Sequence, residues 1–283
     1  MPTAHVNNCN LTYERRGSGP CVIFIHGESH GIEMFADQLP HFSKRYDCIA
    51  YYRRGHGKSE SALYGYSLWN QTQDLACLLD HLNIQQAVII AVAMSTTIAS
   101  TYTLLHPERV RALVLASWYE LDGYPELEKR RKKHPISFAE LHLMMGRILV
   151  SEGRAALVEF LEREHERYFP IFPRDKAVRL EVAKMFASHP PEHYVQSAEF
   201  YTSIPNITSQ MGAVTCPVLG ISGDDDPSPD RPELLARLPN FRQTWIGGAR
   251  RFTMMEQPEA FNREVDKFLA SLDVRDSPSA WGV

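Results

Sequence analysis

The sequence has no paired set of cysteines, no long hydrophobic run and no strong excess of charge of either sign. Its five cysteines are odd in number and lack C-x-x-C spacing, which favours reduced thiols over disulfides or a zinc site. No stretch approaches the roughly 18 uninterrupted apolar residues of a membrane span, and the N-terminus has no apolar signal segment. A net charge of −4 creates no field that would attract nucleic acid or an acidic membrane. We therefore expect a cytoplasmic protein that binds a small molecule, with neither nucleic acid nor membrane as a partner. The oligomeric state is open.

Sequence fingerprints of the common nucleotide cofactors are missing as well. Neither G-x-G-x-x-G nor G-x-x-x-x-G-K-S follows a predicted strand, so no cofactor is expected. The basic run at residues 128–133 (EKRRKK) is interpreted as the solvated face of a helix.

Short apolar runs alternate with amphipathic segments over most of the chain. Strands are predicted at 21–27, 47–53, 87–93, 110–117, 217–223 and 241–248. Helices are predicted at 32–45, 67–82, 95–106, 232–238 and 258–272. Continuous apolar strands separated by helices of this length indicate parallel strands covered on both faces. The predicted fold class is therefore α/β, with a mostly parallel, doubly wound sheet.

Between residues 120 and 211 the strand signals stop and every predicted segment is helical. An all-helical block between two strands of an open sheet lies at the carboxyl edge, where such sheets bind ligands. We expect a helical cap (lid) over residues 120–211, inserted into a core formed by residues 1–119 and 212–283. Its aromatic and methionine side chains are candidates for lining an apolar pocket: Met144, Met145, Phe160, Tyr168, Phe169, Phe172, Met185, Phe186, Tyr194, Phe200 and Tyr201.

Five short motifs occur in the order and spacing of one known family. They are HGE at 26–28, similar to an oxyanion loop, RRGHGKS at 53–59, HPERVRALVL at 106–115, GDDDP at 223–227, similar to an acid loop, and EQPEAF at 256–261. Each motif alone is weakly specific, but together they resemble the α/β-hydrolase fold over residues 8–272. The resemblance implies an α/β-hydrolase core with a helical cap. It also implies that the GDDDP loop supplies a catalytic acid, so no metal is expected there.

Alanine occupies the position of the family's nucleophile. The family's serine lies eleven residues after the leucine that matches Leu82 and thirteen before the histidine that matches His106, and both counts give Ala93. The G-x-S-x-G motif then has no hydroxyl, thiol or carboxylate at its centre. A register shifted by two residues would make Ser95 the nucleophile, and this alternative is kept open.

Arginine occupies the position of the family's histidine. The segment 248–252 reads GARRF and places Arg251 there. A guanidinium stays protonated and cannot serve as an ordinary general base. Asp226 matches the triad acid, so a bidentate ion pair between Asp226 and Arg251 is expected. The resemblance therefore predicts a triad-deficient member of the superfamily.

The remaining polar residues at the carboxyl ends of the strands define a candidate site. The candidate catalytic residues are His30, Glu28, Asp226 and Arg251, and the backbone amides of Glu28 and Met94 are candidates for an oxyanion hole. His30 is the best placed titratable side chain, although it can equally begin the next helix in water. Glu28 is the alternative acid or base, because burial raises the pKa of a carboxyl group. The predicted pocket residues are Ser29, Tyr52, Ser95, Trp118 and Tyr119.

These residues support three hypotheses of function. The first is an enzyme without the Ser–His nucleophile system that catalyses a non-hydrolytic reaction of the lyase, isomerase, cyclase or decarboxylase type on a small, largely apolar carbonyl or carboxylate compound. The second is a catalytically silent small-ligand-binding or regulatory module. The third is a hydrolase that uses an activated water or Ser95.

Overall fold

The computed structural model describes residues 1–117, 123–130, 135–227 and 238–275 of the 283-residue chain. Within these residues eight strands form one sheet in the order β1-β2-β4-β3-β5-β6-β7-β8. The pairs from β4 to β8 are parallel, whereas β1–β2 and β2–β4 are antiparallel. The strands are β1 (Thr3–Val6), β2 (Cys9–Arg16), β3 (Cys21–Ile25), β4 (Asp47–Tyr51), β5 (Ala87–Val92), β6 (Val110–Ala116), β7 (Val218–Gly223) and β8 (Phe241–Ile246). The predicted α/β-hydrolase fold class is confirmed.

The sequence analysis missed the N-terminal hairpin of β1 and β2. Its two-residue turn consists of Asn7 (φ 45°) and Asn8 (φ 54°). A two-residue hairpin whose central residues both have positive φ is a type I′ turn, which asparagine tolerates better than most residues. The Asn-Asn pair between two alternating segments was therefore a usable signal for this hairpin.

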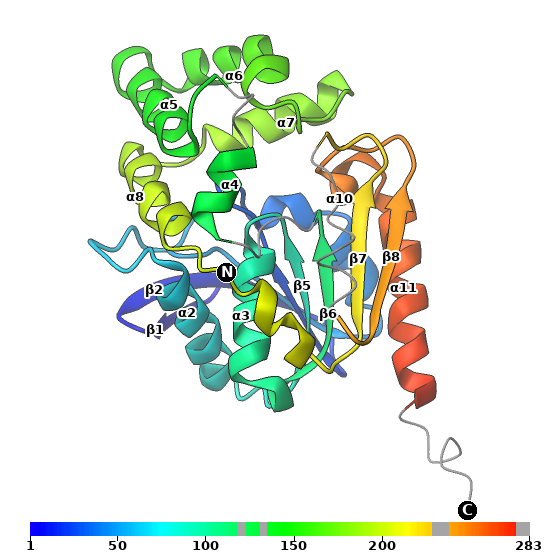
Figure 1. Cartoon of the computed structure of the whole chain (residues 1–283). Coiled ribbons are helices and arrows are strands. Elements are labelled where there is room, and N and C mark those ends of the chain that lie inside the picture. The colour runs from blue at the N-terminus through cyan, green and yellow to red at the C-terminus, as the bar shows by residue number, and fades with distance from the viewer. Residues whose placement is uncertain (118–122, 131–134, 228–237, 276–283) are drawn as a thin grey trace, which may run out of the picture.

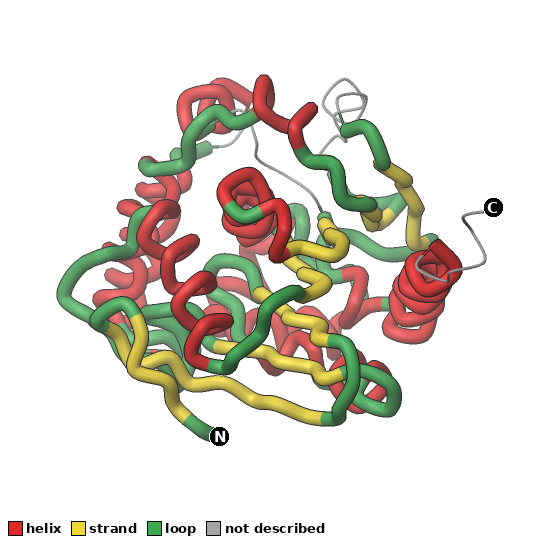
Figure 2. The backbone as a smooth tube through the Cα atoms, turned by 90° about the horizontal axis from the view of Figure 1, so that it is seen from below, coloured by secondary structure: helices red, strands yellow, loops and turns green. Residues whose placement is uncertain are grey.

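Helices cover both faces of the sheet (Figures 1 and 2). Successive strand residues point to opposite faces, so Val22 and Phe24 pack in one apolar cluster and Ile23 and Ile25 in the other. The first cluster also contains side chains of α1 and α11, and the second contains side chains of α2 and α3. These helices are α1 (Gln38–Phe42), α2 (Leu68–His81), α3 (Ser95–Leu105) and α11 (Pro258–Arg275). A short helix, α10 (Thr253–Glu256), precedes α11.

A helical layer between β6 and β7 lies over the carboxyl ends of the strands (Figure 1). It contains α4 (Tyr124–Arg130), α5 (Phe138–Glu152), α6 (Arg154–Tyr168), α7 (Lys176–Phe186) and α8 (Pro191–Thr202). Helix α5 begins with a capping box, in which Ser137 Oγ accepts from the Glu140 N–H and the Glu140 carboxylate accepts from the Ser137 N–H. This fixes the start of the helix that forms one wall of the site. The exact division of the chain at residues 119/120 and 211/212 stays a prediction.

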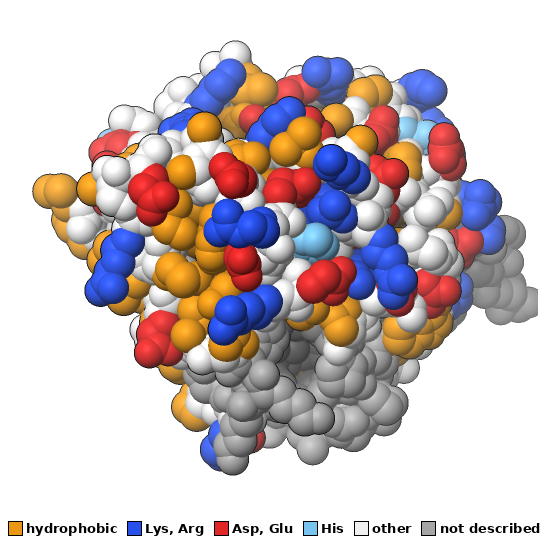
Figure 3. Space-filling view, turned by 90° about the horizontal axis from the view of Figure 1, so that it is seen from above, with side chains coloured by type: hydrophobic (Ala, Val, Ile, Leu, Met, Phe, Trp, Pro, Cys, Tyr) orange, Lys and Arg blue, Asp and Glu red, His pale blue; other side chains and the backbone are white. Residues whose placement is uncertain are grey.

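Other predicted elements differ in detail. The segment 32–45 is not one helix, because a 3₁₀ turn at Ile32–Phe35 ends before α1 begins. The helix predicted at 232–238 lies almost wholly outside the described residues, as does part of the basic run at 128–133. In the described part of the chain no helix is both long and apolar enough to cross a membrane. On the cap side, described Lys and Arg side chains are interspersed with Asp and Glu (Figure 3).

Candidate active site

The turn between β5 and α3 places Ala93 at the centre of the site. Ala93 has a φ of 51°, and its N–H donates to the Ala116 carbonyl at 2.9 Å. A non-glycine residue with positive φ is uncommon and marks a constrained turn. The expectation that Ala93 lies on a constrained strand-to-helix turn is confirmed.

Ser95 lies in the first turn of α3 and not at the centre of this strand-to-helix turn. Its side chain is fully buried, and its hydroxyl donates to the carbonyl oxygen of His26. This hydrogen bond directs the hydroxyl to the backbone of the oxyanion loop.

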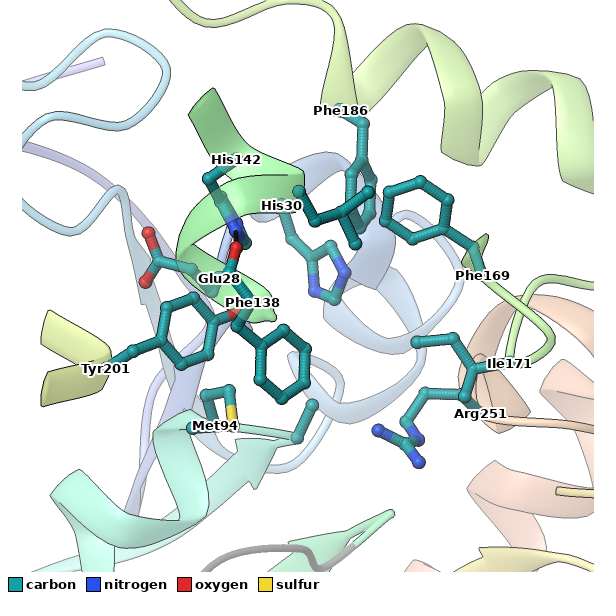
Figure 4. Close-up of a pocket in the computed structure, with 12 residues that line it drawn as sticks. Glu28, His30, Met94, Phe138, His142, Phe169, Ile171, Phe186, Tyr201 and Arg251 are labelled. Carbon is teal, nitrogen blue, oxygen red and sulfur yellow. Dashed lines mark hydrogen bonds between the residues drawn. The ribbon is translucent and has the colours of Figure 1, made fainter. Parts of the chain in front are cut away.

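A cavity of about 50 Å³ lies between the turn and the cap (Figure 4). The core contributes Glu28, His30, Ala93, Met94 and Arg251 to its lining. The cap contributes Phe138, Leu141, His142, Phe169, Ile171, Phe186 and Tyr201. An apolar wall with a few polar groups on one side is the chemical character of a small-molecule site, but ligand pockets usually measure about 300–1,000 Å³, so the cap would have to move to admit a ligand.

Glu28 and Met94, whose backbone amides are predicted to form an oxyanion hole, both line the cavity. Glu28 follows β3 and Met94 follows the Ala93 turn. Among the residues that the structure describes, no acceptor is bonded to the N–H of Glu28 or of Met94. These two donors are therefore available to a carbonyl oxygen of a ligand.

His30 is held between an aromatic ring of the cap and one of the core. Its ring centroid lies 5.1 Å from that of Phe186 and 5.0 Å from that of Phe252. Burial, with a smaller contribution from nearby His56, lowers the pKa of His30 to about 3. The ring is therefore neutral at pH 7, and its Nδ1 has no hydrogen-bond partner within the described part of the chain. The His30 ring lines the cavity, and its unpaired Nδ1 is buried beside Gly27.

Arg251 and Asp226 form the predicted bidentate ion pair. The Arg251 Nε and Nη2 atoms donate to the two Asp226 oxygens at 2.8 and 3.1 Å. Their side chains are only 3% and 5% exposed. Arg251 lines the cavity, whereas Asp226 lies behind it.

The Glu28 carboxylate is turned into a buried polar network. It accepts from Arg53 Nη2 at 2.7 Å and from the Ser197 hydroxyl at 2.7 Å. Burial favours the neutral acid, but the Arg53 guanidinium holds the pKa of Glu28 well below its usual range. Glu28 therefore stays ionised and hydrogen-bonded. The sequence analysis expected burial to raise its pKa, and the structure shows the opposite direction.

Three predicted pocket residues are placed elsewhere, and two lie outside the described residues. The Ser29 hydroxyl is bonded to His193, the Tyr52 hydroxyl donates to Glu33, and Ser95 binds His26 as described above. None of these three side chains lines the cavity. Trp118 and Tyr119 fall within the undescribed segment 118–122.

Some cap residues that line the cavity, and the buried polar network around the Glu28 carboxylate, were not predicted from the sequence. Phe138, Leu141 and His142 form one face of α5 at positions i, i+3 and i+4, a helical pattern that the capping box could have marked. Ile171, in the loop after α6, carried no such signal. The partners of Glu28 lie on α8 and on the turn at 53–59, and no local pattern connects these segments.

Comparisons with known proteins agree with this fold. The family model for the alpha/beta hydrolase fold matches residues 20–142. The chain is 28% identical to a putative non-heme bromoperoxidase of Mycobacterium tuberculosis, with 93% of this chain and 98% of the relative covered. It is 25% identical to a putative 2-succinyl-6-hydroxy-2,4-cyclohexadiene-1-carboxylate synthase of Bacillus subtilis (92% and 93% covered) and 25% identical to a 3-oxoadipate enol-lactonase of Acinetobacter baylyi (87% and 87%).

Among solved structures, a carboxylesterase of Nitrososphaera gargenis superposes with a TM-score of 0.81 at 23% identity, covering 96% of this chain and 99% of that one. The sheet order, the helical insertion after β6 and these similarities lead to one conclusion: the chain has the α/β-hydrolase fold.

Proposed function

We propose that this protein is an enzyme that hydrolyses a small, largely apolar ester or lactone bearing a carboxylate group, with water instead of a serine as the attacking nucleophile. The observation that carries the proposal is Ala93 at the positive-φ turn, in the lining of the same cavity as His30 and Arg251. At this position a superfamily hydrolase would present its nucleophile, and an alanine methyl group cannot form a covalent intermediate.

The other groups of the cavity have complementary roles in this proposal. The N–H groups of Glu28 and Met94 polarise the substrate carbonyl and stabilise the oxyanion that forms on attack. Neutral His30 accepts a proton from the attacking water once the negative charge of the bound substrate carboxylate has raised the pKa of the ring from about 3. Glu28 and Asp226 are poorer candidates for the base, because Arg53, Ser197 and Arg251 occupy their carboxylate oxygens.

Arg251 is assigned the recognition of the substrate carboxylate. Its guanidinium is the charged group that reaches the cavity from the core side opposite His30 (Figure 4). A planar guanidinium pairs well with carboxylates. The names of two relatives, the enol-lactonase and the synthase, also specify carboxylate compounds. In this proposal Arg251 binds the substrate and Asp226 holds Arg251, so neither residue acts as part of a serine–histidine system.

The experiment is a single-turnover assay in ¹⁸O-labelled water with small enol lactones and esters, each offered with a free carboxylate and as its methyl ester. We expect one labelled oxygen in the product acid, no covalent adduct by intact-protein mass spectrometry, and preference for the free carboxylate. Arg251→Gln should remove that preference, and Arg250→Gln, in the adjacent and less buried arginine, should keep it. A mass adduct during turnover, or equal rates for acid and ester in the wild type, contradicts the proposal.

A second candidate is a non-hydrolytic reaction that proceeds through an enolate-like state, favoured by the likeness to the synthase. The same cavity serves it, because the two amides would stabilise the enolate and His30 would move the proton. Solvent-deuterium exchange next to the substrate carbonyl, without ¹⁸O incorporation, distinguishes this reaction from hydrolysis. If a small carboxylate binds saturably but neither ¹⁸O incorporation nor deuterium exchange is seen, the protein would be a ligand-binding module without catalytic activity.

A further inference from the structure

A second cluster of polar side chains lies behind the cavity lining, where the cap meets the core. It consists of Glu28 from the oxyanion loop, His56 from the turn at 53–59 and His193 from α8. His56 Nε2 lies 3.3 Å and His193 Nε2 lies 3.8 Å from Glu28 Oε1. The three potential ligand atoms lie within 4.8 Å of one another, and each side chain is at most 3% exposed.

Backbone carbonyls fix the orientation of both histidine rings. His56 Nδ1 lies 3.0 Å from the Arg54 carbonyl oxygen, and His193 Nδ1 lies 3.1 Å from that of Gly55. A carbonyl oxygen only accepts hydrogen bonds, so each Nδ1 carries a hydrogen. The Ser29 N–H donates to His56 Nε2 and the Ser29 hydroxyl approaches His193 Nε2 at 3.0 Å. Both Nε2 atoms are therefore acceptors that Ser29 satisfies, and each has the lone pair that a metal ligand needs, at 3.3 and 3.8 Å from Glu28 Oε1.

This arrangement is what a metal site requires. Metal-bound histidines usually donate their other ring N–H to a carbonyl or carboxylate, which fixes the tautomer. Ligand bonds of about 2.0–2.1 Å in a tetrahedron separate the donor atoms by roughly 3.3–3.4 Å. The His56–Glu28 distance of 3.3 Å matches this value, whereas the His193–Glu28 distance of 3.8 Å would have to shorten when an ion binds. Two histidines and one carboxylate are a donor set that suits zinc and similar divalent ions.

We propose that Glu28, His56 and His193 form a buried binding site for a divalent cation of the zinc type. The Ser29 hydroxyl lies beside the remaining coordination position. The site is structural, because its ligands come from the cap and from the core and are closed to solvent. A bound ion would tie α8 to the oxyanion loop and so hold the Glu28 amide in place. This inference departs from the expectation, drawn from the sequence, that the protein has no metal.

Arg53 sets a limit on the affinity. Its guanidinium binds Glu28 Oε2 at 2.7 Å and places a positive charge near the ion. Glu28 Oε1 already accepts from the Ser197 hydroxyl at 2.7 Å, so an ion would share this oxygen with Ser197. We therefore expect weaker binding than in zinc sites without a neighbouring cation.

The test uses the full-length chain after removal of metals with a chelator and desalting. Isothermal titration with Zn²⁺ should give one equivalent per chain, and Co²⁺ should give the visible absorption bands of a four-coordinate ion with nitrogen ligands. His56→Gln and His193→Gln should each weaken Zn²⁺ binding by at least about 100-fold. Loss of a residue that only hydrogen-bonds to a metal ligand already weakens binding by about 10- to 100-fold, so loss of a ligand itself should cost at least as much. His142→Gln is the matched control, because His142 is also buried on the cap and bonds a backbone carbonyl through Nδ1.

Two results overturn the proposal. One is the absence of saturable Zn²⁺ and Co²⁺ binding by the wild-type chain. The other is wild-type affinity in the folded His56→Gln and His193→Gln variants, which would place the ion elsewhere. Should these variants fail to fold, the number of nitrogen ligands in the wild-type Co²⁺ complex, measured by X-ray absorption, decides. Fewer than two nitrogen ligands would contradict the proposed site. None of these readouts depends on hydrolysis.

Discussion

Both carboxylate oxygens of Asp226 are bound by the guanidinium of Arg251, and the pair is nearly closed to solvent. Removal of one partner of such a pair leaves an uncompensated charge in the interior, which typically costs about 3–5 kcal/mol. We expect Asp226→Asn to lower the free energy of unfolding by an amount near this range, measured by urea denaturation. The adjacent Asp225→Asn is the control.

Asp225 pairs with Arg174 and Arg250 at the surface, where its side chain is 37% exposed, so we expect that substitution to cost about 1 kcal/mol or less. Equal losses in the two variants would show that the Asp226–Arg251 pair is solvated in solution.

A serine at position 93 should be insufficient to make a serine hydrolase. In Ala93→Ser the new hydroxyl would face Arg251, which cannot accept its proton, so we expect no labelling by a fluorophosphonate. In the double variant Ala93→Ser/Arg251→His, a histidine beside Asp226 supplies a base, and labelling should appear. Peptide mapping locates the label, and Ser95→Ala controls for the second serine. Stoichiometric labelling of the wild-type chain at Ser95 would refute the assignment of Ala93 to the nucleophile position.

Gly27 makes room for the His30 ring. A Cβ atom added at Gly27 would lie 2.5 Å from Nδ1 and 2.7 Å from Cε1 of His30, so the ring must move. We expect Gly27→Ala to lower stability by about 1–3 kcal/mol, as overpacking usually does, and to weaken binding of small carboxylates. Calorimetry and thermal melting measure the two effects. Gly247→Ala is the control, since its Cβ would meet only Asp224 Oδ2, at 3.8 Å. Unchanged ligand affinity in Gly27→Ala would argue against His30 as part of the site.

Glu256 should make the stability depend on pH between the ordinary carboxyl range and neutrality. Burial raises the pKa of Glu256 to about 7 from 4.5, despite N–H bonds from Arg250 and Phe252. Between these values the folded chain binds a proton that the unfolded chain has released. The free energy of unfolding therefore falls as pH rises from about 4.5 to about 7, by roughly 3 kcal/mol from this group.

Urea denaturation at a series of pH values, with Glu256→Gln as the comparison, isolates this contribution. Glutamine keeps an acceptor oxygen for both N–H groups, so the variant should lose this part of the pH dependence and keep the fold. Parallel stability curves for the two proteins would rule out the raised pKa.

The sequence alone predicted six of the eight described strands, a helical block between β6 and β7, and the ion pair between Asp226 and Arg251. Strand and helix periodicities are local properties of the chain, and the motif spacings that locate Ala93 run through β5 and α3 without a gap. The same spacings predicted the ion pair, because they place Arg251 beside Asp226 and a guanidinium pairs strongly with a carboxylate. Even the missed hairpin had a local signal in Asn7 and Asn8.

Only the tertiary structure decided what the polar side chains at the carboxyl edge do. Ser29, Tyr52 and Ser95 are near the predicted site in the sequence, yet their hydroxyls bind His193, Glu33 and His26. Glu28 stays ionised because Arg53 and Ser197 of α8, which are distant in the sequence, donate hydrogen bonds to its carboxylate. The direction of a side chain depends on partners that are distant in the sequence. The cap brings His193 to within 3.8 Å of the Glu28 carboxylate across 165 positions of chain, and no periodicity or motif encodes that contact.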